Sequence, residues 1–214
     1  MKKICLYCLI AFLISCNKQH CPDGINKLPM YGQVPKCPEQ IEIDNDFLKE
    51  CDELFENRKE AAVRHIDYGW GYFYKNQLDL AMSRFNQAWL LDKSNADIFW
   101  GYGNILGKKG DFEKSIVYLK ESISINPKNP KSWESISTSY GQLFFKTKNI
   151  EDLDKTIESL KTSMKLDPKN TRVYGELANV YSYLAQKDSL RKYVELSDSI
   201  GSTSVSPIAR ERLK

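Results

Sequence analysis

The chain has 214 residues, a formal net charge of +3, and 42% hydrophobic against 28% charged residues. This balance is typical of one globular domain with a hydrophobic core, and it argues against a chain that is disordered throughout. The 31 basic and 28 acidic residues nearly cancel, so bulk charge does not indicate binding to nucleic acid, and no nucleic-acid partner is expected.

The N-terminus, MKKICLYCLIAFLISC, places Lys2 and Lys3 before an apolar run from Ile4 to Ile14. This is the layout of a secretory signal, and the run is too short for a membrane-spanning helix. Its last four residues, LISC, end at Cys16 and resemble a bacterial lipobox. The resemblance implies that the Cys16 thiol is diacylated and that the chain is cut before it. We therefore expect a lipoprotein signal peptide over 1–15.

A lipidated Cys16 would carry two or three palmitate-like acyl chains, and two or more chains hold a protein firmly on a membrane. The alternative is an ordinary signal peptide that is cut nearby, with Cys16 present by chance. Asn17 follows Cys16 in place of the aspartate that retains many enterobacterial lipoproteins at the inner membrane. These residues predict a lipid anchor in a bacterial cell envelope and favour the outer membrane.

The other cysteines beyond the predicted cleavage site are Cys21, Cys37 and Cys51. An exported protein could pair two of them and leave one free, and the sequence does not choose among the three pairings. We expect no metal site, since no two of these cysteines share a tight ligand spacing and the only histidines are His20 and His65.

Residues 16–43 are rich in proline and glycine, which predicts a lipidated N-terminus followed by an extended tether. At ~3 Å per residue, such a tether could lift the rest of the chain several tens of ångströms from a membrane. Residues 44–61 are predicted to form an N-terminal helix, because Phe47, Leu48, Cys51 and Leu54 recur at three- and four-residue steps.

From residue 62 onward the chain repeats itself. Polar, turn-like runs begin at Asp92, Asn126 and Asp167, each is followed by an aromatic residue at a fixed offset, and the runs are 34 and then 41 residues apart. A period near 34 with helical periodicity indicates stacked helix pairs. The pattern resembles the tetratricopeptide repeat, over 62–95, 96–129, 130–170 and 171–200, with 201–214 left as a C-terminal tail.

The resemblance implies an all-α fold, a right-handed superhelix of about four helix pairs behind the N-terminal helix. Gly69, Gly103, Ser137 and Ala178 occupy the small position at which paired helices approach closely. In the third repeat, seven additional residues around 143–154 predict a longer helix pair or a loop.

By the same resemblance, the first helix of each pair lines a concave face. Exposed aromatic residues beside amides are typical of surfaces that hold a peptide. We therefore select six candidate partner-binding residues: Trp70, Tyr74, Trp100, Asn104, Asn179 and Tyr183. The alternative is that the first three pack against the N-terminal helix, over 46–57. The face has no convincing set of lysines and asparagines like the one that clamps C-terminal carboxylates in chaperone-binding members.

No HExxH, Walker A or GxSxG motif occurs, so we expect neither an enzyme nor a cofactor. Stretches such as AMSRFNQAWLLD and KLPMYGQVPKCPEQ resemble those of repeat lipoproteins from Bacteroidota-type bacteria. The sequence thus predicts a membrane-anchored scaffold that binds a protein or peptide partner in the bacterial envelope. The alternative is a fixed structural subunit of an envelope or secretion assembly.

Overall fold

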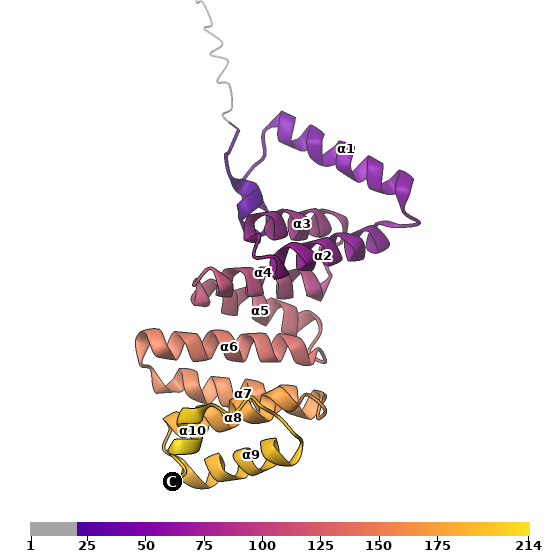
Figure 1. Cartoon of the computed structure of the whole chain (residues 1–214). Helices are drawn as coiled ribbons and strands as arrows, with labels where there is room; N and C mark the ends of the chain where they lie inside the picture. The colour runs from indigo at the N-terminus through magenta and orange to yellow at the C-terminus, as the bar shows by residue number, and fades with distance from the viewer. Residues whose placement is uncertain (1–20) are drawn as a thin grey trace, which may run out of the picture.

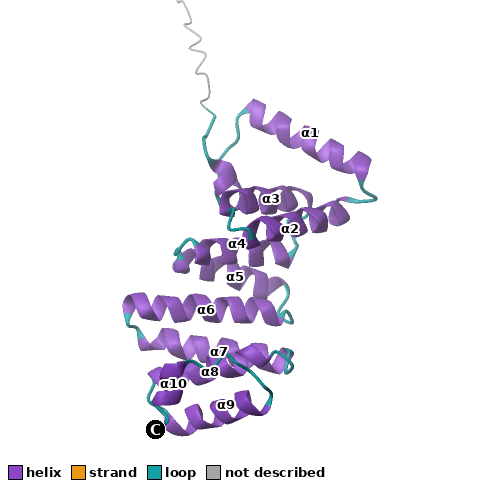
Figure 2. Ribbon diagram, viewed as in Figure 1, coloured by secondary structure: helices purple, strands orange, loops and turns teal. Residues whose placement is uncertain are grey.

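The computed structural model describes residues 21–214, and every regular element in this range is helical (Figures 1 and 2). Two short 3₁₀ turns, Ile25–Lys27 and Pro29–Gln33, come first. The α-helices that follow are α1 (Pro38–Leu54), α2 (Arg58–Tyr74), α3 (Leu78–Leu91), α4 (Ala96–Lys108), α5 (Phe112–Ile125), α6 (Pro130–Thr147), α7 (Ile150–Leu166), α8 (Thr171–Tyr183), α9 (Lys187–Ser199) and α10 (Pro207–Glu211). The all-α superhelix that the sequence predicts is confirmed.

Four antiparallel helix pairs, α2/α3, α4/α5, α6/α7 and α8/α9, stack in chain order along the molecule (Figure 1). In each pair, the first helix is called the inner helix and the second the outer helix. Between pairs, the inner helix packs mainly on the outer helix of the pair before it: α4 on α3, α6 on α5 and α8 on α7. Each pair therefore contacts chiefly its neighbours in the chain, as expected of a solenoid.

The recurring polar runs are the starts of the inner helices. The side chain of Asn95 accepts a hydrogen bond from the backbone N–H of Asp97, and Asn129 does the same for Lys131. Such N-caps satisfy donors that the first helical turn leaves unpaired. Pro130 fits the first turn of α6, where no backbone N–H is required.

Glycines permit the close packing of α4 on its neighbours. A Cβ atom on Gly103 would lie 2.5 Å from Cγ of Leu119 in α5, and one on Gly101 would lie 2.3 Å from Cε1 of Phe85 in α3. Phe85 and Leu119 are fully buried. The core thus fills the volume that a side chain at either glycine would need.

The third pair has longer helices than the second and fourth pairs, which flank it. α6 has 18 residues and α7 has 17, whereas α4 and α8 have 13 each. The additional residues around 143–154 thus extend both helices, and Lys148, with a φ of 62°, turns the chain between them. The longer α6 carries Phe145 beyond the length of its neighbours.

The segment 21–37 is folded, so the prediction of an extended tether is wrong for this part of 16–43. Cys21 and Cys37 form a disulfide, and Tyr31 is buried. The buried side chain of Asn86 in α3 donates hydrogen bonds to two backbone carbonyls of the segment, those of Asn26 (3.1 Å) and Leu28 (2.9 Å). These contacts hold the segment against the first helix pair. α1 begins directly after it, six residues before the predicted helix start at 44.

Both ends of the described chain lie on the helix stack. α1 packs through Phe47, Leu48 and Cys51, together with Phe55 directly after it, on Ala61, Ala62 and Leu91. At the other end, the chain reverses after α9 at Gly201, where φ is 70°, and returns so that α10 packs on α8. Residues 201–214 therefore form a folded element where the sequence predicted only a tail.

The predicted signal peptide and Cys16 lie outside the described residues. Within 21–214, none of the helices combines the length and the apolar character that crossing a membrane requires.

Candidate functional site

The inner helices α2, α4, α6 and α8 line a concave groove. Its middle is a hollow of about 450 Å³, with polar and basic groups from α4, α6 and α8 and one aromatic ring from α2. The lining includes Phe73, Asn104, Lys108, Ser135, Thr138, Gln142 and Arg172. This hollow spans several repeats, with lining residues from α2, α4, α5, α6 and α8.

An aromatic cluster closes the α2 end of the groove. The ring centroids of Trp70 in α2 and Trp100 in α4 are 4.2 Å apart, and those of Trp70 and Phe73 are 5.3 Å apart. Tyr74, with its centroid 6.0 Å from that of Trp70, is 75% exposed. The cluster is thus a packed aromatic platform with one open ring, and such rings supply large contact areas to partners.

Trp100 and Asn104, which the sequence analysis selected as partner-binding residues, are engaged within the protein. The indole N–H of Trp100 donates to Oγ of Ser135 in α6 at 2.8 Å, and the Ser135 hydroxyl donates to Oδ1 of Asn104 at 3.2 Å. The amide of Asn104 donates to the Trp100 carbonyl at 2.8 Å. This chain of hydrogen bonds joins α4 to α6. The side-chain NH2 group of Asn104 can donate one more hydrogen bond, and its carbonyl oxygen can accept one more.

The alternative in which α1 covers the aromatic residues is wrong. The apolar side of α1 packs on Ala61, Ala62 and Leu91, a cluster that contains neither Trp70 nor Trp100. The aromatic platform instead packs on the core around Phe85, whose ring centroid is 5.4 Å from that of Trp70. The open face of Tyr74 therefore remains available.

A network of charged groups links α6 to α8 beside the hollow. The carboxylate of Glu134, which is buried, pairs with Arg172 and accepts a hydrogen bond from the Asn170 amide at 3.0 Å. Arg172 also lies 3.3 Å from Glu176, and burial raises the pKa of Glu176, an effect that Arg172 opposes. Since both carboxylates are internal to the network, the charged groups that line the hollow are Lys108 and Arg172.

The remaining two predicted residues, Asn179 and Tyr183, lie at the α8 end of the groove. The C-terminal part of the same chain occupies the groove there. The side chain of Asn179 donates to the Ser204 carbonyl at 2.9 Å and accepts from the Ser206 N–H at 2.8 Å. Tyr183 is 41% exposed, and its ring centroid is 5.2 Å from that of Phe145. The six predicted residues thus form two groups, separated by α6, and do not form one continuous site.

Residues 96–129, which form α4 and α5, match the family model of the tetratricopeptide repeat. The chain has the tetratricopeptide repeat fold. It is similar to the first such domain of Spaghetti (RPAP3) bound to an HSP90 peptide, at 16% identity and a TM-score of 0.53, covering 59% of this chain and 95% of that one.

Two further solved structures cover more of the repeats. A tetratricopeptide repeat protein of Thermus thermophilus has 15% identity and a TM-score of 0.57, covering 71% of this chain and 79% of that one. A crystal structure of MamA has 16% identity and a TM-score of 0.58, covering 78% of this chain and 95% of that one. At these identities, the likeness concerns the fold.

The first tetratricopeptide repeat buries the one free thiol of the described chain next to a histidine. Cys51 Sγ lies 4.0 Å from Nε2 of His65, which also contacts the Phe47 ring edge-on. Burial raises the pKa of the Cys51 thiol and lowers the pKa of His65. A nucleophilic cysteine needs a lowered pKa and access to substrate, so this pair is a packing contact.

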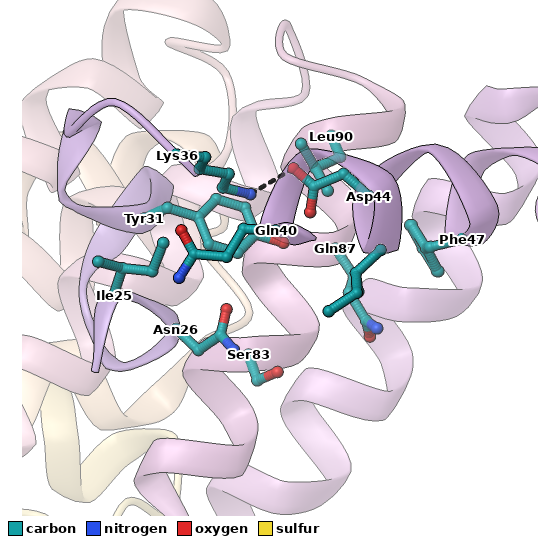
Figure 3. A pocket seen from close by; sticks show the side chains of 11 residues that line it. Ile25, Asn26, Tyr31, Lys36, Gln40, Asp44, Phe47, Ser83, Gln87 and Leu90 are labelled. Atoms are coloured by element: carbon teal, nitrogen blue, oxygen red, sulfur yellow. Dashed lines mark hydrogen bonds and ion pairs between the residues drawn. The ribbon is translucent and has the colours of Figure 1, made fainter. Parts of the chain in front are cut away.

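A small hollow of about 130 Å³ lies between the disulfide-closed segment, α1 and α3 of the first repeat (Figure 3). Lys36 pairs with Asp44 across it, and the Lys36 ammonium lies 3.2 Å from the centroid of the Tyr31 ring. Burial raises the pKa of the Tyr31 hydroxyl above its ordinary range. The two charged groups that line the hollow, Lys36 and Asp44, pair with each other. The hollow therefore marks the place where the N-terminal segment meets α1 and the first helix pair.

Sequence reasoning placed the inner-face positions but missed two features of the site. Ser135 of α6, whose hydroxyl accepts the hydrogen bond from the Trp100 indole, is not among the six candidate residues. The C-terminal residues 202–206 show no helical periodicity, so the sequence predicts only a tail there. One signal that could have indicated their docking is Gly175, a second small residue on the inner side of the last repeat.

Proposed function

We propose that the protein is a membrane-anchored scaffold of tetratricopeptide repeats that binds a protein or peptide segment along its concave groove. The observation that carries the proposal is the open groove itself, which Lys108 and Arg172 line, with the exposed Tyr74 beside the lining residue Phe73. Peptide-binding surfaces usually combine aromatic side chains, which anchor the peptide, with polar groups that already have hydrogen-bond partners. One protein of the same fold is described as bound to an HSP90 peptide.

The residues favour a bacterial envelope as the place of action. The lipobox ending at Cys16 supports a lipid anchor, and Asn17 favours the outer membrane. The disulfide between Cys21 and Cys37 fits an oxidising compartment such as the periplasm or the cell surface. Exchange of Cys16 for alanine should move the protein from the membrane fraction to the soluble fraction.

The alternative, a fixed subunit of an envelope or secretion assembly, is favoured by a separate observation. α1 exposes Ile41, Ile43 and Leu54 at 48%, 67% and 69%, on a helix that packs on the repeats by one side only. In an assembly, a permanent partner could cover these exposed side chains.

Photo-crosslinking distinguishes these possibilities. A benzophenone amino acid in place of Tyr74 reports on the groove, and the same group in place of Tyr68, 50% exposed on the same helix, is the matched control. We expect light-dependent adducts from position 74 and none from position 68. One adduct of fixed stoichiometry would favour the subunit, and a set of different adducts would favour the scaffold for several partners. Absence of adducts at position 74, or equal adducts at both, would refute the groove as the binding surface.

A further inference from the structure

The C-terminal segment, residues 202–212, does not continue the superhelix. Each later inner helix packs mainly on the outer helix that precedes it, so a fifth repeat or a capping helix would lie on α9. α10 instead makes its main contacts with α8, the inner helix of the last pair (Figure 1). The segment thus returns to the concave side, where the groove continues from α4 and α6.

The backbone of this segment is held as a bound peptide would be. Asn179 donates to the Ser204 carbonyl and accepts from the Ser206 N–H, so one side chain pairs with two backbone groups on either side of Val205. A side-chain amide can satisfy a backbone donor and acceptor in this way for any residue type. Asn104 occupies the equivalent position of the second repeat, on α4, facing the open part of the groove.

Gly175 lets the segment approach the surface of α8. A Cβ atom at this position would lie 2.6 Å from Cβ of Ser204 and 2.8 Å from the backbone nitrogen of Val205. Any other residue at 175 would therefore displace the segment. Val205 is 7% exposed and joins the core cluster of the last repeat, so an aliphatic side chain fixes the register of the segment.

Ala209 of α10 is the other apolar anchor, fully buried in the same core cluster, and the remainder of the segment is polar or exposed. Ser202, Thr203, Ser204 and Ser206 surround Val205, and Ile208 of α10 is 51% exposed. The segment also uses Arg212, which donates to the Ser182 carbonyl at 2.7 Å and lies 4.9 Å from the Tyr183 ring. Few apolar groups are thus buried for the number of residues that are ordered, which is the condition for local opening without unfolding of the whole domain.

An open hollow of about 310 Å³ adjoins the docked segment. It is lined from α6 by Gln142 and Phe145, from α8 by Val180 and Tyr183, and from the segment by Ser206. A partner that extended along the groove from α4 across α6 would meet the docked segment at this hollow.

We propose that the last repeat is a peptide-binding subsite that the chain's own residues 202–212 occupy, and that a partner segment displaces them. The partner has the chemistry of the occupant: an extended backbone that pairs with Asn179, a small residue over Gly175, and an aliphatic side chain directly after it. This inference rests on the proposed role of the concave face. It adds that the α8 end of the groove is closed until a partner competes for it.

The test uses the full chain with a protease site inserted after Gly201, an exposed turn, and cleaved in the folded protein. A fluorescein-labelled synthetic peptide of residues 202–214 is then added, and binding is followed by anisotropy. We expect saturable exchange into the nicked protein, weakened at least tenfold by Asn179→Ala. The matched control is Asn45→Ala, an exposed asparagine of α1, which should leave binding unchanged.

Two peptide variants test the register. V205D in the peptide should weaken binding at least tenfold, because this side chain is buried, whereas I208D should bind as well as the parent peptide, because Ile208 is exposed. Equal loss from both variants would overturn the proposed register, and absence of any exchange would overturn the proposed subsite.

Hydrogen exchange on the intact chain keeps the test decisive if the nicked protein unfolds. Amides of 202–212 should exchange at least tenfold faster than those of α8, and Asn179→Ala should accelerate them further without changing α4 to α7. Exchange of 202–212 as slow as that of α8 would make the segment a permanent part of the fold. Photo-crosslinking at Tyr74 tests the open end of the groove separately. Adducts at Tyr74 without peptide exchange at the last repeat would refute the occupied subsite but leave the groove as the binding surface.

Discussion

Substitution of Gly103 by alanine tests whether α4 and α5 pack as closely as the structure indicates. In a helix, replacing glycine by alanine gains up to ~1 kcal/mol from the helix propensity alone. At Gly103 the new Cβ would lie 2.5 Å from Cγ of Leu119, well inside the contact distance of about 3.5–4.0 Å between carbon atoms. The Ser115 carbonyl oxygen, also on α5, lies 3.1 Å from the same point, and as a backbone atom it cannot rotate away as a side chain could.

Overpacking of a core costs about 1–3 kcal/mol, so Gly103→Ala should lower the free energy of unfolding by on the order of 1–2 kcal/mol after the propensity gain. Gly103→Leu adds more atoms to the same contact and should cost at least as much. The matched control is Gly71→Ala in α2, where nothing lies within 4 Å of the new Cβ. That variant should gain about 0.5–1 kcal/mol.

Urea denaturation followed by circular dichroism measures all three variants against the parent. Leu119→Ala provides the double-mutant test, since removing this side chain should relieve part of the cost of Gly103→Ala and make the two changes non-additive. A Gly103→Ala variant as stable as Gly71→Ala would mean that α4 and α5 are farther apart than described, and the repeat register would be wrong.

Three further changes have defined outcomes. Asn86→Ala should destabilise by about 1–3 kcal/mol, because it removes two hydrogen bonds to the N-terminal segment and one from the Tyr102 hydroxyl; an unchanged urea midpoint would contradict this. Trp100→Ala should cost on the order of 2–4 kcal/mol through its lost ring contact and indole bond, and a thermal scan would show an unchanged Tm if Trp100 were only a surface residue. Because burial lowers the pKa of His65 in the fold, the unfolded chain binds this proton more tightly, so stability is full above the ordinary value of 6.5 and falls as pH drops below it. Thermal scans from pH 7.5 to 5.5 should show this loss in the parent and a smaller one in His65→Gln.

The repeats could be predicted from the sequence because their determinants are local. Asn95 and Asn129 cap the helices that directly follow them, and Gly103 marks a close approach between helices that are adjacent in the chain. The positions on the concave face follow from the same register. Each of these features depends on residues within one or two repeats, which a periodic pattern records.

What could not be predicted depends on distant partners. Proline and glycine suit an extended tether and a folded loop equally well, and the contact that decides for the loop joins Asn26 to Asn86, 60 residues later. Likewise, the Trp100 indole donates its hydrogen bond to Ser135 in the next repeat, and the backbone groups that pair with Asn179 lie 25 and 27 residues beyond it. The sequence indicates on which face of a helix an asparagine lies, but not which group its side-chain amide contacts there.

The folded segment that starts at Cys21 has a consequence for how the protein would stand on a membrane. Five peptide units from Cys16 to Cys21 reach at most roughly 18 Å, at about 3.6 Å per residue. If Cys16 carries the acyl chains, Cys21 lies within that distance of the lipid headgroups, while α9 lies at the opposite end of the helix stack (Figure 1). So short a connection would keep the folded N-terminal segment close to the bilayer surface, and partners of the repeats would be met near the membrane rather than far from it.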